Sequence, residues 1–512
     1  MQEEIFPKNS ERKGASFTRK QNFIEVKLYD NILRMPHAGK FVKDIGLVGI
    51  AHMLTNVRGF ILLPILAKTL GAAEYGIWSQ LSITVNFLIP LTSLGLPNAL
   101  IRFLPATKEA RDAREQIWSS VLFTLGISAL AGLCIVLLGG PLQRVVQIPL
   151  PFMVFLAFLV ITQSLNNVFS GTIQAFQEAK KLSAFIILSP LADIVFVSIA
   201  VATNQGLLGA VYAMFLAKLL ILALFLLIIA SKVGVALPNF SRMKEYLSFS
   251  LPTVAGNLSY RVVQVGDQYV IGVVLGILFV GYYAPAYSLG ILLNMFTLPI
   301  GMVLPALLAK LFSENNTREI QKYLSNTLTY VFLLLIPATC GISILSKQLL
   351  EMFSTAEIAL HSYLVVPFVA ASFLLFAAQG IFVQVLYLFK KTRAVGVMWF
   401  FAALLNLGLN LVFVPLWGLL GAAFTTLLAY LFVFAATWFI SSQYLPFPIE
   451  WKTLFKSAAA AIAMSAAILL FGPEGLLQTS IAIIGGAILY GFLLFAFKGI
   501  GKKELEFLAK LF

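Results

Sequence analysis

The sequence predicts an all-α integral membrane protein of about 14 transmembrane helices, arranged as two pseudo-symmetric six-helix bundles plus two extra C-terminal helices. Three observations predict this class. The 512 residues are 60% hydrophobic and 11% charged, whereas a soluble domain carries about 25% charged residues. Apolar runs long enough to span a bilayer recur along the whole chain. Short motifs also repeat at offsets of 205 to 212 positions.

Fourteen apolar runs are long enough, at about 20 residues, to cross a bilayer as helices, which satisfy their own backbone polar groups. They cover approximately residues 45–67, 77–104, 117–138, 151–176, 182–202, 207–230, 245–275, 279–309, 323–346, 363–389, 394–415, 418–441, 455–472 and 477–499. The predicted parts of the chain follow from them: a basic cytoplasmic tail 1–44, an N-terminal lobe 45–230, a cytoplasmic linker 231–244, a C-terminal lobe 245–441, helices 13 and 14 within 442–500, and a cytoplasmic tail 501–512.

The Lys and Arg residues lie almost entirely on one side of these spans. If the N-terminus is cytoplasmic, 29 of the 36 fall in cytoplasmic segments, four fall within spans, and three fall in external loops, namely Lys68, Arg144 and Lys347. The positive-inside rule therefore places both termini in the cytoplasm of a multi-pass cell-membrane protein. The same asymmetry explains the net charge of +14, which indicates contact with anionic lipid and not with nucleic acid.

Three motifs occur twice, in the same order and on corresponding spans. Residues 70–76 and 275–281 both read Leu-Gly, four residues, Gly; "QAFQEAKK" and "QVLYLFKK" end spans four and ten; "GLLGA" opens spans six and twelve at Gly206 and Gly418. A constant order at a nearly constant offset indicates the internal duplication of a six-helix unit. Because six is an even number, both copies have the same orientation, and their symmetry axis runs along the membrane normal.

Charged residues inside the spans are the candidate functional residues, because each costs about 2.5–3.5 kcal/mol at a helix centre. Arg58 and Arg261 lie at similar depth in spans one and seven, which the duplication makes equivalent. Neither has an acidic residue three or four positions away in its own helix, which favours a cationic substrate-binding cavity between the bundles. Arginine suits phosphate in particular, through planar bidentate pairing.

The other charges within the spans leave alternatives open. Arg102 either joins the cationic cavity or extends to the headgroups at the cytoplasmic end of span two. Lys218 is a candidate for the same cavity and Asp193 for ion coupling, unless the two neutralise each other on consecutive helices. Asp267 either pairs with Arg261 or carries a proton or a sodium ion.

Several classes of protein lack support in the sequence. There is no Gly-rich nucleotide loop, so energy is expected from an H+ or Na+ gradient or from the substrate gradient. There is no His-Glu-x-x-His motif, and we predict no catalytic residue, no metal site and no bound cofactor. A membrane glycosyltransferase or polymer ligase is disfavoured because no long external loop is present.

Two stretches of the sequence resemble a known family. Residues 62–106, "LLPILAKTLGAAEYGIWSQLSITVNFLIPLTSLGLPNALIRFLPA", resemble the start of the Wzx-type polysaccharide and O-antigen flippases, members of the multidrug/oligosaccharidyl-lipid/polysaccharide (MOP) exporter superfamily. Residues 260–289 are similar to the start of the second bundle in that family, where an Asp followed by an apolar run and Leu-Gly is usual. The likeness covers about residues 45–500.

The resemblance implies a flippase, and not an enzyme, that moves an oligosaccharide linked to polyprenyl pyrophosphate by alternating access, for cell-surface polysaccharide biosynthesis. It also implies arginines in a central cavity, and Arg58, Arg102 and Arg261 fit by location. A drug exporter of the MATE type is the alternative, although the excess of basic over acidic charge at mid-span counts against it. A polysaccharide polymerase as partner and the identity of the coupling ion stay open.

Overall fold

A computed structural model describes residues 38–107 and 109–497, and every regular element in these residues is a helix. The predicted all-α membrane class is confirmed, because 12 helices of the described chain are long and apolar enough to cross a membrane. The number 14 stays a prediction. The element α2 (Ala38–Thr92) joins two helices across a kink at Gly71 and contains the predicted first span and most of the second. The predicted seventh span, α9 (Met243–Val274), is not among the 12.

The first bundle runs from α2 to α8. After α2 it contains α3 (Leu96–Phe103), the 3-10 turn η1 (Leu104–Ala106), α4 (Ala110–Leu137), α5 (Gly139–Val146), α6 (Leu150–Ala175), α7 (Ala179–Ala202) and α8 (Gly206–Val233). α2 begins at Ala38, so it extends seven residues into the predicted tail 1–44. Residues 1–37 and the predicted tail 501–512 lie outside the described residues.

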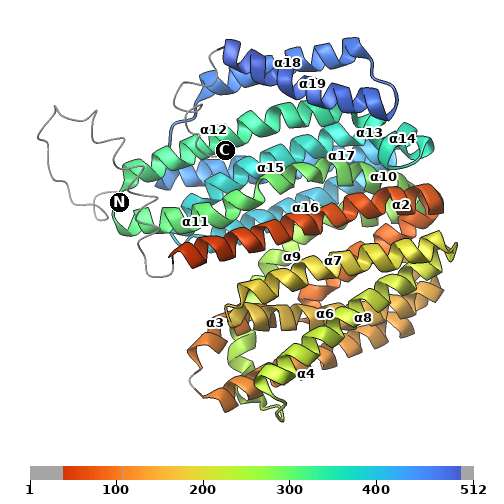
Figure 1. The fold of residues 1–512 in the computed structure, drawn as a ribbon, viewed down its shortest axis with the longest axis vertical. Coiled ribbons are helices and arrows are strands. Elements are labelled where there is room, and N and C mark those ends of the chain that lie inside the picture. Colours follow the sequence, from red (N-terminus) through yellow and green to blue (C-terminus); the bar gives the residue numbers. More distant parts are fainter. Residues whose placement is uncertain (1–37, 108, 498–512) are drawn as a thin grey trace, which may run out of the picture.

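The second bundle runs from α9 to α17, and two further helices follow it. After the turn η2 (Phe240–Arg242) and α9, it contains α10 (Ile277–Ile291), η3 (Leu292–Phe296), α11 (Leu298–Ser313), α12 (Thr317–Ile344), α13 (Ser346–Phe353), α14 (Ala356–Ser362), α15 (Val365–Leu388), α16 (Thr392–Trp417) and α17 (Leu419–Tyr444). The extra helices α18 (Trp451–Phe471) and α19 (Gly475–Ala496) pack beside α12, on the side away from the first bundle (Figure 1).

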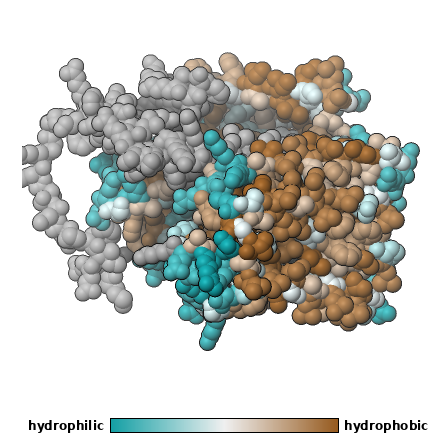
Figure 2. All heavy atoms as spheres, turned by 60° about the horizontal axis from the view of Figure 1, so that its bottom comes forward, coloured by the Kyte–Doolittle hydropathy of each residue, from teal (hydrophilic) through white to brown (hydrophobic). Residues whose placement is uncertain are grey.

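The outer surface of the helices is apolar, as a lipid-facing surface must be. Leu470, Leu477 and Phe439 are 89%, 74% and 70% exposed. Figure 2 shows that such side chains form a broad apolar surface, with hydrophilic residues towards its edges. A soluble protein rarely exposes apolar patches of this extent, so the surface agrees with insertion into a bilayer.

One end of the helix bundles carries most of the basic residues, and we call it the basic end. The connections at residues 107 and 109, and around residues 176–178, 234–242, 314–316, 389–391 and 445–450, lie there. Lys232, at the end of α8, donates a hydrogen bond of 2.7 Å to Glu178 and thereby holds the pKa of that carboxyl below its usual value. Lys68, Arg144 and Lys347 lie towards the opposite end, as the charge asymmetry predicts.

Matching glycines end the first helix of each bundle. The backbone leaves the helical conformation at Gly71, with φ 75°, and at Gly276, with φ 101°. Glycine adopts positive φ without a steric penalty, whereas other residues do not. The repeated Leu-Gly motif is therefore the point at which each bundle turns from its first to its second span.

The two bundles touch backbone to backbone at the second glycine of that motif. A Cβ atom placed on Gly76 would overlap the carbonyl oxygen of Ile277, and one on Gly281 would overlap the carbonyl oxygen of Ala72. Ala72 and Ile277 occupy equivalent positions in the repeat. The contact is therefore reciprocal, as expected where α2 and α10 cross at the pseudo-twofold axis.

The "GLLGA" motifs also have matching geometry. Gly206 and Gly418, with φ 63° and 59°, lie at the start of α8 and α17. A Cβ on Gly421 would overlap the backbone of Phe413 in α16, so this motif forms the expected tight seam. In the first copy the corresponding Cβ on Gly209 would meet the side chain of Gln205 and not a neighbouring helix. Of the two copies of this motif, only the second places its inner glycine directly against the backbone of a neighbouring helix.

We expect Gly281→Leu to destabilise the protein strongly, because the new side chain would meet backbone atoms of α2 that cannot move independently. The loss should exceed about 3 kcal/mol, the upper end of ordinary overpacking. Gly126→Leu in α4 is the matched control, since a Cβ there has no neighbour within 4 Å. Thermal unfolding in detergent should separate the two variants; equal midpoints would show that α2 and α10 do not depend on this crossing.

Candidate functional site

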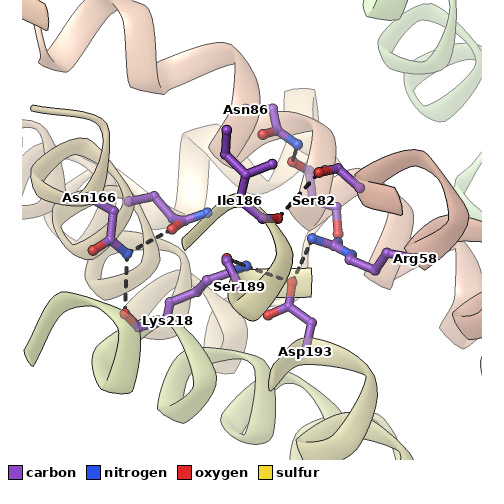
Figure 3. Close-up of polar contacts among 10 residues, drawn as sticks. Arg58, Ser82, Asn86, Asn166, Ile186, Ser189, Asp193 and Lys218 are labelled. Atoms are coloured by element: carbon purple, nitrogen blue, oxygen red, sulfur yellow. Dashed lines mark hydrogen bonds and ion pairs between the residues drawn. The ribbon is translucent and has the colours of Figure 1, made fainter. Parts of the chain in front are cut away.

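Three charged residues of the first bundle meet in one buried cluster (Figure 3). Arg58 on α2 donates from Nη1 to Oδ2 of Asp193 on α7 at 2.6 Å, and Lys218 on α8 donates from Nζ to the same oxygen at 2.6 Å. Lys218 also donates to Oγ of Ser189 at 2.9 Å. The pairing of Asp193 with Lys218, one of the two expected alternatives, is thus present, and Arg58 joins it.

We call this cluster the ion triad. It contains two basic groups and one carboxylate, so its formal charges leave one positive charge in excess. Both cations share one oxygen of Asp193, and the other oxygen, Oδ1, accepts no hydrogen bond within the described chain. The side chains of Asp193 and Lys218 are 1% and 5% exposed, whereas that of Arg58 is 28% exposed. Arg58 is therefore the member of the ion triad through which the excess charge reaches the surface of the described structure.

A proline next to the triad explains how α7 and α2 are joined. Pro190 lies inside α7 and has no N–H to donate to the carbonyl oxygen of Ile186. That oxygen instead accepts a hydrogen bond of 3.4 Å from Oγ1 of Thr55, one turn before Arg58 on α2. The carbonyl oxygen that Pro190 leaves free therefore makes a second contact between the two helices that carry Arg58 and Asp193.

Arg261 lies on the face of α9 that meets the first bundle. Seven residues before it, Val254 packs against Gly95, whose Cβ would lie 2.9 Å from Val254 Cγ2. Seven residues after it, Gln268 accepts a hydrogen bond of 3.2 Å from Ser79. Residues seven positions apart share one helix face, so Arg261 points towards the first bundle between two interbundle contacts.

The guanidinium of Arg261 has no acidic partner in the described structure. It donates to Oε1 of Gln264 at 3.4 Å, and its side chain is exposed. No carboxylate of the described residues lies within 4.0 Å of it, so the expected alternative of an Arg261–Asp267 pair is not realised. Arg58 and Arg261 thus differ, because only Arg58 is held by a carboxylate.

The structure places Arg102 apart from the ion triad. α3 ends near the basic end, where the guanidinium carbon of Arg102 lies 5.0 Å from the ring centre of Phe249 on α9. A second aromatic contact, to Phe103, is 5.8 Å long. These are cation–π distances, and the side chain is exposed. Arg102 therefore lies at the seam between α3 and α9 on the basic end.

Asp267 is fully buried in the second bundle and is held by neutral donors (relative exposure 0%). Its Oδ2 accepts hydrogen bonds from the hydroxyl of Tyr283 at 2.5 Å and from Oγ1 of Thr426 at 3.2 Å. Its Oδ1 accepts from the backbone N–H of Gln268 at 2.8 Å. A buried carboxylate without a basic partner among the described residues is a candidate for taking up a proton or a small cation.

Two buried asparagines of α16, the helix that packs against α9, were not identified from the sequence. Asn406 on α16 is fully buried, and a Cβ on Gly266 would lie 3.7 Å from its Oδ1. Neither amide atom of Asn406, nor Oδ1 of Asn410, has a hydrogen-bond partner in the described chain. Buried polar atoms without partners are uncommon in native structures. The signal was the stretch "NLGLN" in an otherwise apolar span, but attention to charge alone misses neutral amides.

Comparison with known proteins relates this architecture to transporters of lipid-linked saccharides. The family model described as "Polysaccharide biosynthesis protein" matches residues 41–309, and the model described as "Lipid II flippase MurJ" matches residues 275–484. The chain is also 21% identical, over 487 residues, to the probable low-salt glycan biosynthesis flippase Agl15 of Haloferax volcanii, with 91% of this chain and 99% of that protein covered.

Solved structures share the fold. The lipid II flippase MurJ in its inward closed conformation superposes with a TM-score of 0.70 at 15% identity, covering 87% of this chain and 97% of that one. An inward-facing MATE multidrug transporter of the MOP superfamily superposes with a TM-score of 0.65 at 16% identity, covering 77% and 98%. At these identities the likeness concerns the fold. With a family model matching more than half of its length, the chain belongs to the polysaccharide biosynthesis protein family, and its fold is that of the MOP superfamily.

Proposed function

We propose that this protein is a flippase that moves an oligosaccharide linked to polyprenyl pyrophosphate from the cytoplasmic to the outer leaflet and releases it chemically unchanged. The observation that carries the proposal is uncompensated positive charge at matching depth in both bundles. Arg58 lies 13 residues before Gly71, and Arg261 lies 15 residues before Gly276. Each guanidinium is therefore about 20 Å along its helix from the turn.

A diphosphate cannot cross about 30 Å of hydrocarbon unaided, because its hydration has no replacement there. Guanidinium groups replace part of that hydration through charge-assisted, bidentate hydrogen bonds. In the proposed mechanism Arg261 and the surplus charge at Arg58 bind the diphosphate from opposite bundles. The prenyl chain stays among lipid tails while the headgroup passes between the bundles.

The contacts between the bundles suit a mechanism of alternating access. On the side of Arg261 that is away from the basic end, the hydroxyl of Tyr269 on α9 donates to Oγ1 of Thr84 on α2 at 2.9 Å. Near the basic end, the amide of Asn98 donates to Oγ1 of Thr253 at 3.4 Å. Arg261 lies between these two contacts. We propose that breaking one contact while the other persists exposes Arg261 to one side of the membrane at a time.

We propose that the basic end is cytoplasmic, with both chain termini on that side, in accordance with the positive-inside rule. The protein then binds the sugars of the substrate first on the side of the membrane that carries Arg102. A polymerase that acts on the translocated product is a compatible partner of such a flippase, on the external side.

We also propose that Asp267 couples transport to an H+ or Na+ gradient. Its oxygens face the Thr426 hydroxyl, and the unpartnered amide of Asn406 lies on the neighbouring helix. A cation bound there would neutralise a buried carboxylate and satisfy polar atoms that otherwise lack partners. The ion would change the packing of α9, the helix that carries Arg261.

Depletion of the protein in its host is expected to leave lipid-linked oligosaccharide in the cytoplasmic leaflet. Sealed vesicles of known orientation, probed with a membrane-impermeant sugar oxidant, measure this distribution.

Arg261→Ala should reproduce the accumulation although the protein inserts normally, whereas Arg261→Lys should retain part of the export. Arg144→Ala, an exposed arginine near the opposite end, is the matched control. Accumulation in the outer leaflet would instead indicate a step after translocation.

Lys218→Met is expected to remove the surplus charge of the ion triad while leaving a neutral Arg58–Asp193 pair. Protein abundance should stay near the wild-type level, but affinity for polyprenyl diphosphate should fall about tenfold, or about 1.4 kcal/mol. Asp193→Leu leaves two cations without a partner and should lose about 3–5 kcal/mol of folding stability. Unchanged diphosphate binding by Lys218→Met would assign the triad a purely structural role.

Asp267→Asn should abolish the stimulation of transport by an ion gradient, because the amide retains the shape of the carboxylate without its charge. Flipping by proteoliposomes is measured with a sodium gradient, a pH gradient or neither. The wild type should respond to one of the gradients, and the variant to none, while both bind polyprenyl diphosphate equally. A variant that still responds would exclude Asp267 from coupling.

A further inference from the structure

We infer that the second bundle contains a separate site for the sugars of the substrate, in a cavity bounded by α9, α11, α15 and α16. The inference rests on the proposed function and concerns the uncharged part of the same substrate. The cavity has a volume of about 1240 Å³, whereas sites for a single small ligand measure about 300–1,000 Å³. It therefore has room for several sugar units.

The cavity lies in the part of the second bundle nearer to the basic end. Its lining residues come from the first half of α9, from the last part of α15 and from the first turns of α16. Thr392 and Arg393, which begin α16, are exposed and bring the cavity to the surface of the basic end. If that end is cytoplasmic, the site is accessible from the side on which the substrate is assembled.

Neutral amides from three elements line the cavity. They are Asn257 on α9, Asn294 on η3, and Gln379 and Gln384 on α15. Each primary amide offers two donors and an acceptor, which matches the mixed donor and acceptor character of sugar hydroxyls. The amide of Gln384 donates to the carbonyl of Gly380 at 3.0 Å, but the side-chain oxygens of Gln379 and Gln384 accept no hydrogen bond from the described residues.

Aromatic rings form the inner wall of the cavity. Tyr260 stacks on Phe376 at 5.6 Å between ring centres, and it meets Trp399 edge to face at 4.8 Å. Gln264 also holds the hydroxyl of Tyr260 with a hydrogen bond of 2.6 Å. Rings fixed by such packing present rigid faces, and the negative face of an aromatic ring attracts the C–H groups of a sugar ring.

The near absence of charge in the cavity lining indicates which class of ligand fits. Among the described lining residues, Arg393 at the mouth carries the only charge, and there is no Asp, Glu or Lys. A cationic drug would therefore bring an uncompensated charge into the cavity. A prenyl chain would leave the amide of Asn257 and the side-chain oxygen of Gln384 without partners in an apolar environment. A neutral, polyhydroxylated ligand satisfies both the amides and the aromatic faces.

The duplication shows how the two bundles came to differ at this depth. At the offset of 212 between the "GLLGA" motifs, Lys218 corresponds to Tyr430. Tyr430 packs on Phe376 at 5.6 Å and on Trp399 at 6.0 Å, so it supports the aromatic wall. The first bundle therefore has charge for the diphosphate where the second bundle has aromatic rings for the glycan.

The inference is tested by measuring the binding of two lipids to the full-length protein in nanodiscs. The probes are polyprenyl diphosphate without sugars and the glycosylated polyprenyl diphosphate extracted from depleted host cells. The wild type should bind the glycosylated lipid at least tenfold more tightly. Gln384→Leu and the exposed Asn257→Leu should each lose about tenfold for that lipid and leave the affinity for the bare lipid unchanged.

Gln478→Leu on α19, remote from the cavity, is the control for the loss of an amide, and a monodisperse elution profile establishes folding of each variant. Equal wild-type affinity for the two lipids would overturn the inference. So would cavity variants that bind both lipids normally or lose both equally. Failure of the proposed function would look different, because the wild type would then bind neither diphosphate lipid.

Discussion

The contact between Gly76 and Gly281 is the constraint on which the arrangement of the molecule depends. Each glycine allows α2 or α10 to lie directly on a backbone carbonyl of the other helix. Because equivalent residues make the contact, it fixes the relative position of the two bundles near the pseudo-twofold axis. The second bundle also packs against α2 through α9, the helix that carries Arg261.

Around that axis, the two bundles have kept one backbone and acquired different chemistry. The first bundle holds a buried carboxylate between Arg58 and Lys218, whereas the second holds Asp267 between Tyr283 and Thr426. In the first, two cations share one carboxylate, which leaves one formal positive charge in excess. In the second, the described residues place no cation beside the carboxylate, and the proposed coupling ion would supply one.

The class, most of the spans and the duplication could be predicted because lipid imposes them on local sequence: apolar runs, basic connections and paired glycines are all visible along the chain. The partner of Arg58 could not be predicted, because Asp193 lies 135 positions away on another helix. The cavity of the second bundle was also missed, because its amides and rings are unremarkable singly and acquire meaning only when four elements bring them together. The helices α5, α13 and α14 escaped prediction because each is only seven or eight residues long.

A reciprocal crossing of this kind is what an isologous homodimer interface becomes when its two protomers are joined in one chain. In such a dimer every substitution occurs twice, so a lysine suited to one half would be imposed on the other. Fusion removes that restriction and lets each half be selected separately. Gly76 and Gly281 at the axis remain restricted to glycine after fusion, because a side chain on either one disturbs both halves.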